Sequence, residues 1–164
     1  MTSISKKIYF ASDQHFGAPT PELSFPREQK FVAWLDEVKK DAEAIFLLGD
    51  LFDFWFEYKT VVPKGFVRVL GKLAEIRDSG IPIYFFVGNH DLWMNDYFEK
   101  ELNIPVFHEN QEYTFHGKTF LVGHGDGKGP GDLGYKRMKK VFTNPFSKWL
   151  FRWLHPDLGV GLAQ

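Results

Sequence analysis

Four short groups of polar residues combine carboxylates, imidazoles and an amide at spacings that could bind cations. They are Ser12-Asp13-Gln14-His15, Gly49-Asp50, Gly88-Asn89-His90-Asp91 and Gly123-His124-Gly125-Asp126. On an extended segment, Asp13 and His15 would point to the same side and could hold one ion. Asp50 follows an apolar run, and its two carboxylate oxygens could bridge two ions. Taken alone, each of these two groups is equally compatible with a capped loop or a turn.

The tetrapeptide Gly88-Asn89-His90-Asp91 is the most specific of the four groups, since average residue usage gives it about one chance in a thousand in a chain of this length. Asn89 offers a neutral carbonyl oxygen, and His90 offers a proton donor. His124 lies between two glycines, so its uncrowded imidazole could reach a metal, although a lone histidine in a glycine loop is more often solvated.

Together these residues form a ligand set of oxygen and nitrogen atoms, which suits two divalent ions of the manganese, iron or zinc kind. The set is Asp13, His15, Asp50, Asn89 and His124. Two ions about 3.5–4 Å apart clamp a phosphoryl group and activate a water at neutral pH. His90, as a residue that is not a ligand, could then stabilise the transition-state charge or protonate the leaving oxygen.

The elements that must position these groups alternate between strand and helix. The pattern predicts strands over 7–12, 44–48 and 81–87, helices over 27–40, 66–79 and 91–102, a hairpin of 112–115 with 118–122, and a helical tail in two pieces broken at Pro145. This alternation predicts an α/β fold with a largely buried sheet. Sites in such sheets form outside the carboxyl ends of the strands, so the four groups should converge on one crevice.

Composition excludes several classes of protein. The chain has 164 residues, of which 44% are apolar, which suits one domain with its own core. It has no Cys, so disulfides and thiolate metal sites are excluded. No apolar run approaches the roughly 20 residues of a membrane span, and the run after Lys7 is too short for a signal peptide. We therefore expect a cytoplasmic protein, and a net charge of −1 gives no general argument for nucleic acid.

The tail has a bias of its own, because six basic and no acidic residues lie between Asp132 and Asp157. An apolar stripe at helical spacing is formed there by Phe146, Trp149, Leu150, Trp153 and Leu154. The spacing is compatible with a helix docked on the core, which periodicity alone favours, and with an interfacial helix on a membrane. Interleaved basic and aromatic residues also occur in single-strand binders, but the acidic remainder of the chain makes nucleic acid the weaker hypothesis.

From about residue 7 to 126, the order and spacing of these motifs resemble the calcineurin-like metallophosphoesterase superfamily. Within it, the chain resembles the UDP-2,3-diacylglucosamine pyrophosphatases of the lipid A pathway, through Phe52-Asp53-Phe54-Trp55, Asp132 and the aromatic-basic tail. The resemblance implies an α/β fold of four layers, a β-sandwich flanked by helices (αββα), incomplete at the C-terminus of this chain. It also implies a core over 1–133 and a cap or interfacial segment over 134–164.

The activity implied by the resemblance is hydrolysis of the pyrophosphate of UDP-2,3-diacylglucosamine to UMP and 2,3-diacylglucosamine 1-phosphate, at the cytoplasmic face of the membrane. The expected cofactors are two divalent ions, manganese first, with iron, cobalt or zinc as alternatives. Asp13 and His15 would hold the first ion, Asp50 both, and Asn89 and His124 the second. Asn89 and His90 would be catalytic and, with Asp132, would contact substrate, while Asp53 would support the site from behind.

The superfamily ends its site with a Gly-His-x-His pair, which this chain lacks, since only His155 follows His124. We therefore expect the chain to be a fragment of a protein of about 250 residues. Two alternatives stay open. The protein could be a metallophosphoesterase for another nucleotide or phosphodiester, or a catalytically silent scaffold on the same fold that binds a partner through its aromatic-basic surface.

Overall fold

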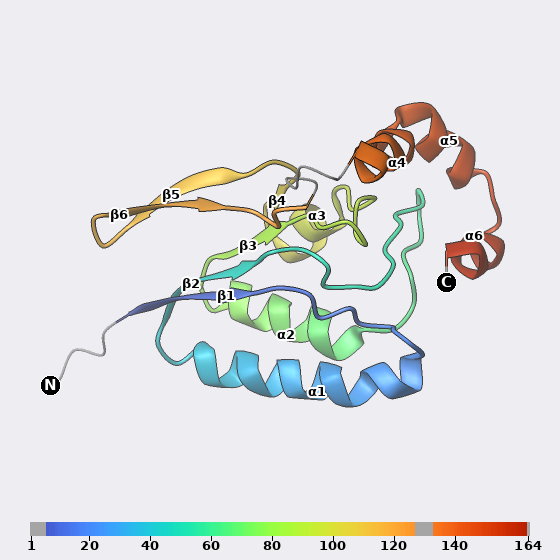
Figure 1. The fold of residues 1–164 in the computed structure, drawn as a ribbon. Coiled ribbons are helices and arrows are strands. Elements are labelled where there is room, and N and C mark those ends of the chain that lie inside the picture. Colours follow the sequence, from blue (N-terminus) through green and yellow to red (C-terminus); the bar gives the residue numbers. More distant parts are fainter. Residues whose placement is uncertain (1–5, 127–132, 164) are drawn as a thin grey trace, which may run out of the picture.

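A parallel sheet with helices on one face forms the centre of the molecule. The computed structural model describes residues 6–126 and 133–163. Strands β1 (Lys7–Ala11), β2 (Ala42–Leu47), β3 (Ile83–Phe86) and β4 (Val106–Phe107) pair in parallel in the order β1-β2-β3-β4. Helices α1 (Pro21–Val38), α2 (Val67–Asp78) and α3 (Tyr97–Leu102) connect these strands, and α1 and α2 lie side by side along one face (Figure 1). The α/β class predicted from the alternation is confirmed.

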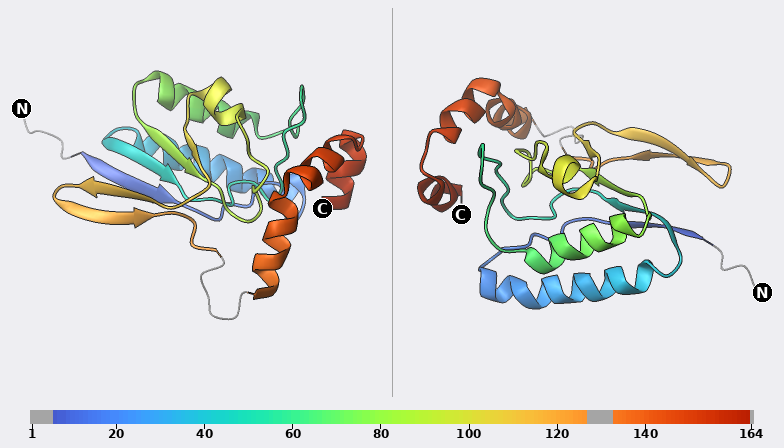
Figure 2. Two further views of the ribbon diagram at one scale, coloured as in Figure 1. Left: turned by 90° about the horizontal axis from the view of Figure 1, so that it is seen from above. Right: turned by 180° about the vertical axis from the view of Figure 1, so that it is seen from behind.

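The opposite face of this sheet is covered by an antiparallel hairpin of β5 (Gln111–Phe115) and β6 (Lys118–Val122) (Figures 1 and 2). Successive side chains of a strand point to opposite faces. Along β2, Ile45 and Leu47 accordingly belong to the core under the helices, whereas Phe46 belongs to the cluster under the hairpin. The Phe46 ring lies 4.9 Å from that of Tyr113, centroid to centroid. Two stacked sheets result, as expected for the β-sandwich.

Three further helices lie beyond the carboxyl ends of the parallel strands (Figure 1). They are α4 (Leu133–Thr143), α5 (Pro145–Arg152) and α6 (Pro156–Ala163). In the part of the chain that the structure describes, no helix covers the outer face of the hairpin, so three of the four expected layers are formed here. None of the described helices is both long enough and apolar enough to cross a bilayer.

Strands β1 to β3, helix α2 and the hairpin agree with the predicted ranges to within about two residues. The helix predicted from residue 27 begins earlier, at Pro21, because Thr20 caps it and a proline suits the first helical turn. The first half of the helix predicted over 91–102 is wrong. The Glu57 carboxylate accepts hydrogen bonds from the backbone of 95–97, so the chain turns there and α3 begins only at Tyr97.

Two further sequence predictions need correction. The tail has three helices instead of two, because a second proline, Pro156, starts α6. Strand β4 was not predicted, since two residues carry no periodicity.

Candidate metal centre

The loops that follow β1, β2, β3 and β6 meet at one end of the sheets. Backbone hydrogen bonds join the first two loops: Asp13 N donates to Gly49 O at 3.1 Å, and His15 N donates to Asp50 O at 2.9 Å. The fourth loop comes from β6, in the second sheet, and not from a strand of the parallel sheet as the predicted alternation suggested. The four polar groups nevertheless converge at one place, as predicted.

Three of the predicted ligands have a backbone conformation that side chains rarely adopt. The φ angles of Asp13, His15 and Asp50 are 59°, 46° and 53°. Each left-handed residue other than glycine costs roughly 1–2 kcal/mol. Such residues cluster at functional sites, where the surrounding structure holds them in place. The loops after β1 and β2 are therefore built to present these three side chains at the expense of local stability.

A close approach of two glycines brings the loop after β2 against the loop after β3. A Cβ atom added to Gly49 would lie 2.6 Å from the backbone nitrogen of Gly88 and 2.9 Å from His124 Nδ1. Gly49 also has a φ of +87°, which a side chain would disfavour. Glycine at this position lets Asp50 lie beside Asn89 and His124.

One group of possible ligands consists of Asp13, His15 and Asp50, whose ligand atoms lie within 4.8 Å of one another. His15 Nε2 is 3.7 Å from Asp50 Oδ2, and His15 Nδ1 is 3.4 Å from Asp53 Oδ1. When Nδ1 carries the proton, it is directed at the Asp53 carboxylate, which leaves the lone pair of Nε2 facing Asp50. Asp53 thus orients His15 as carboxylates commonly orient metal-binding histidines.

A second group consists of Asp50, Asn89 and His124. His124 Nδ1 is 2.7 Å from the carbonyl oxygen of Leu48, which can only accept, so Nδ1 carries a proton. In the neutral imidazole the bare Nε2 then lies 3.3 Å from Asn89 Oδ1 and 3.5 Å from Asp50 Oδ2. Three acceptor atoms face one another here with no hydrogen between them, an arrangement that a cation would satisfy. The residues present therefore fit a divalent ion that accepts oxygen and nitrogen ligands.

Asp50 belongs to both groups. Its Oδ2 faces His15 on one side and His124 on the other, while its Oδ1 accepts a hydrogen bond from the backbone nitrogen of His90 at 2.9 Å. The residue is only 3% exposed, so its side chain is fixed between the two histidines. A carboxylate in this position can serve two cations at once.

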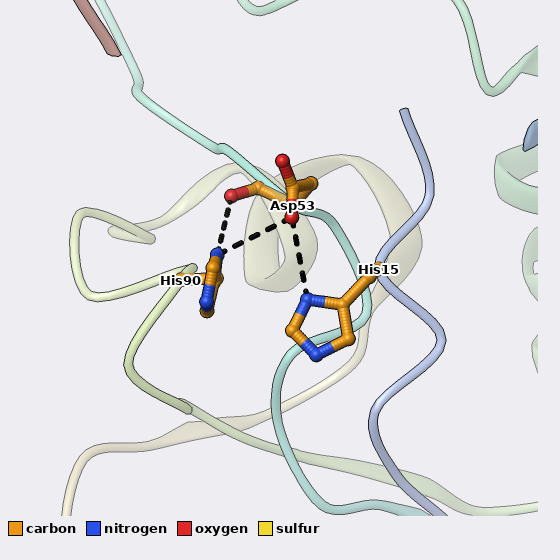
Figure 3. Close-up of side chains that lie close together, drawn as sticks. All are labelled: His15, Asp53 and His90. Carbon is orange, nitrogen blue, oxygen red and sulfur yellow. Dashed lines mark hydrogen bonds and ion pairs between the residues drawn. The ribbon is translucent and has the colours of Figure 1, made fainter. Parts of the chain in front are cut away.

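His90 lies beside this centre and is held by Asp53 (Figure 3). His90 Nδ1 is 2.8 Å from the carbonyl oxygen of Asp53 and 3.4 Å from its carboxylate Oδ1. The same Oδ1 is 3.4 Å from His15 Nδ1, so Asp53 lies between the two imidazoles, whose rings meet edge to face. These three residues also lie close enough to hold an ion. The sequence suggested only a supporting role for Asp53, without this double contact.

Asp91 is a buried residue of the site to which the sequence assigned no role. Its carboxylate accepts hydrogen bonds from Gly88 N at 2.6 Å and from Leu51 N at 3.1 Å. Burial raises the pKa of Asp91 to about 7, against the lowering effect of these hydrogen bonds. Asp91 joins the loop that carries Asp50 to the loop that carries Asn89. Its place in the tetrapeptide was the only signal available in the sequence.

Helices α4 and α5 are attached to the loops of the site. Lys139 forms an ion pair with Asp126 at 2.6 Å, close to His124 in the chain. Trp93 Nε1 donates to the carbonyl oxygen of Phe142 at 2.6 Å, and the Trp93 and Phe151 rings lie 4.6 Å apart. The predicted substrate contact Asp132 lies outside the described residues.

The apolar stripe of the tail faces solvent, so α5 docks on the core through a different face from the one that the periodicity indicated. Phe146, Trp149 and Trp153 are 67%, 52% and 74% exposed. Helix α5 contacts the core through Phe151, which lies outside the stripe, because the aromatic rings of Phe56 and Trp93 face it there. Both sides of α5 are therefore aromatic, and the outer side is uncovered by the described residues.

A largely apolar cavity of about 780 Å³ opens beside Asp53. It lies between the start of α1, the loop before α2 and the start of α6, with Phe16, Phe25, Phe54, Val62 and Phe66 among its walls. Lys64 and Arg68 also line it. The candidate metal centre therefore adjoins a space that could receive an apolar group.

Comparisons with known proteins agree with this geometry. Residues 6–158 match the family model described as calcineurin-like phosphoesterase. The chain is 43% identical over 158 residues to a UDP-2,3-diacylglucosamine hydrolase of Porphyromonas gingivalis, covering 96% of this chain and 60% of that protein. It is 32% identical over 154 residues to the protein of the same name from Edwardsiella ictaluri, covering 94% and 58%. The chain thus spans about 60% of the length of these curated relatives.

A solved structure shares the fold. The crystal structure of a protein of unknown function, AQ665 from Aquifex aeolicus, superposes with a TM-score of 0.53 at 21% identity. The match covers 82% of this chain and 71% of that one. At this identity the similarity supports the architecture alone.

Proposed function

The chain belongs to the calcineurin-like phosphoesterase family, and we propose that it forms the metal-binding part of a hydrolase that cleaves the pyrophosphate of UDP-2,3-diacylglucosamine. The products would be UMP and 2,3-diacylglucosamine 1-phosphate. One observation carries the proposal: Asp50 Oδ2 lies 3.7 Å from His15 Nε2 and 3.5 Å from His124 Nε2, as a ligand shared by two ions requires. The names of the relatives supply the substrate.

The proposed ligands divide into two sets that share Asp50. Asp13 and His15 would hold one divalent ion with it, and Asn89 and His124 would hold the other. When bound, such a pair of ions stabilises charge on a phosphoryl group and lowers the pKa of a water. Manganese is the proposed metal, with iron, cobalt and zinc compatible with the same donor atoms.

His90 is the proposed general acid. Because its Nδ1 is directed at the carbonyl and carboxylate oxygens of Asp53, its Nε2 is free to act on a substrate. When the imidazole carries a proton on Nε2, that nitrogen can bind a phosphate oxygen and give the proton to the leaving group. Asn89, and Asp132 outside the described residues, are proposed to contact the substrate as well.

A lipid-linked substrate accounts for the apolar surfaces around the site. The cavity beside Asp53 is lined mainly by aromatic and aliphatic side chains, which suits an apolar group better than a second sugar or nucleotide. Trp149 and Trp153 project from α5, and the tail carries an excess of basic residues. Exposed tryptophans beside basic residues are typical of helices at a lipid interface. We therefore propose peripheral attachment to the cytoplasmic face of the membrane.

Release of UMP from UDP-2,3-diacylglucosamine in the presence of Mn²⁺ tests the proposal. We expect activity that chelation abolishes and that the variant H124A lacks. Hydrolysis of bis(p-nitrophenyl) phosphate without hydrolysis of the lipid would favour a phosphoesterase for another substrate. Absence of any manganese-dependent hydrolysis, even with the full-length protein and under conditions in which the relative from P. gingivalis is active, would favour a silent scaffold.

A further inference from the structure

Residues in the first turns of α1 form hydrogen bonds and ring contacts with the loop that carries His15. The backbone nitrogen of Gly17 donates to Ser24 Oγ at 2.8 Å, and Ser24 Oγ in turn donates to the buried carboxylate of Glu28 at 2.9 Å. Phe31, one turn further along the helix, packs edge to face on Phe16 with the ring centroids 5.4 Å apart. These contacts fix the loop to the helix, but none of them touches His15.

Arg27 makes the contact with His15 itself. Its Nη2 donates to the carbonyl oxygen of His15 at 2.8 Å and to that of Ala18 at 2.5 Å. The amide of Ala18 also donates to the His15 carbonyl, at 3.2 Å, and the amide of His15 donates to Asp50 O at 2.9 Å. Both backbone groups of His15 are therefore anchored, one to the loop of Asp50 and the other to α1.

The conformation of His15 explains why such an anchor is needed. With a φ of 46°, the residue has left-handed backbone geometry that an unrestrained loop would abandon. A change of that angle would swing the imidazole away from Asp50 and Asp53. Among the described residues, the Arg27 guanidinium forms no ion pair with a carboxylate, and it donates to these two carbonyls.

We propose that Arg27 is a positioning residue, which holds His15 in its left-handed conformation and thereby sets the imidazole for the ion shared by Asp13, His15 and Asp50. The assignment rests on the metal-site proposal above. It predicts that loss of Arg27 weakens this ion selectively and leaves the ion of Asn89 and His124 unaffected. A role in general stability would weaken both equally.

A cycle of variants of this chain, followed by Mn²⁺ titration with electron paramagnetic resonance, tests the selectivity. In the H124A background, which retains the His15 group, R27A should lower Mn²⁺ affinity about 10- to 100-fold, as loss of a ligand-orienting partner typically does. In the H15A background, R27A should change affinity by less than about twofold, since the residue it positions is gone. Equal effects in the two backgrounds would overturn the proposal.

Two further variants control for the loss of an arginine. Arg77 also donates to two backbone carbonyls, of Ile81 and Asn103, but lies at the far end of α2, so R77A should leave both affinities unchanged. R27K should recover affinity to within about threefold of the wild type, because an ammonium can donate to both carbonyls. Failure of R27K to recover affinity would contradict the hydrogen-bonding role.

Hydrogen exchange of the metal-free chain, read by nuclear magnetic resonance, tests the positioning without any ion. R27A should accelerate exchange of the Ala18 amide at least about tenfold and shift the imidazole signals of His15, with those of His124 unchanged. An Ala18 amide and a His15 imidazole that match the wild type would refute the role of Arg27. If the wild type binds no Mn²⁺ while R27A shows these changes, the metal-site proposal fails and the positioning role stands.

Discussion

Gly88 and Asp50 lie so close together that a Cβ atom at Gly88 would be 2.2 Å from Asp50 Oδ1. The same atom would lie 2.6 Å from the Asp50 backbone nitrogen, so no rotation of the carboxylate could relieve the clash. Because Asp50 is the residue that both ligand groups share, the space at Gly88 controls the whole centre. The geometry links a residue with no functional group directly to the proposed chemistry.

The variant G88A should therefore disrupt the centre. We expect a loss of about 1–3 kcal/mol in the free energy of unfolding from overpacking, together with loss of Mn²⁺ binding. Urea unfolding and Mn²⁺ titration measure the two effects. G71A is the matched control, because Gly71 lies within α2 with no atom near its would-be Cβ, and alanine there should be neutral or stabilising. A fully stable G88A that binds Mn²⁺ normally would contradict the account.

Asp91 should be required for the connection between the two loops. D91A would leave the buried amides of Leu51 and Gly88 without their acceptor, at a cost on the order of 2–3 kcal/mol in unfolding free energy. Thermal or urea unfolding measures the loss. D78A changes an exposed aspartate on α2 and should stay within about 0.5 kcal/mol of the wild type. Equal unfolding free energies of D91A and D78A would show that the two hydrogen bonds of Asp91 do not stabilise the fold.

The sequence predicted best the strands and helices whose apolar residues follow the pattern of their own burial, such as a strand buried on both sides or a helix buried along one face. The apolar run of β2 is buried on both sides, by α1 and α2 and by the hairpin, and its prediction is confirmed. Helix α2 buries Val69, Leu73 and Ile76 at helical spacing, which the periodicity indicated. Where side chains of distant residues decide the local structure, as Glu57 does for 95–97, periodicity fails.

The residue types of the candidate centre were readable from the sequence, but their arrangement was not. His124 follows a strand of the second sheet, and the end of a strand has the same pattern in either sheet. Asp53 contacts both His15 and His90, and the contact with His15 depends on the left-handed backbone of that residue. Such a conformation in a residue other than glycine cannot be predicted from the sequence pattern. Both faces of α5 carry aromatic residues, so the amphipathic period alone could not show which face contacts the core. The structure shows that this contact is made by Phe151.

His90 should matter for turnover and not for binding of the ions. Because His90 is proposed to donate a proton and is not one of the five proposed ligands, H90A should lower kcat about 10²- to 10⁴-fold. Its affinity for Mn²⁺ should stay within about twofold of the wild type, since the ligands remain. H116A, in the exposed turn of the hairpin, serves as the control histidine. Loss of Mn²⁺ in H90A would instead assign His90 to a metal group with His15 and Asp53.

The outer face of α5 should bind lipid. A variant with F146A, W149A and W153A should sediment less with vesicles of phosphatidylethanolamine and phosphatidylglycerol, because it loses the exposed aromatic surface. The variant L23A/L121A removes exposed apolar side chains from α1 and β6 and should sediment like the wild type. Unchanged sedimentation of the aromatic variant, or an equal loss in the control, would remove the membrane proposal.

Anomalous diffraction from crystals of the chain soaked in Mn²⁺ tests the shared role of Asp50 most directly. The account predicts two peaks about 3.5–4 Å apart on either side of Asp50 Oδ2, one near His15 and one near His124. Anomalous peaks that lie away from Asp50, or an Asp50 carboxylate without any ion beside it in crystals saturated with Mn²⁺, would contradict the account.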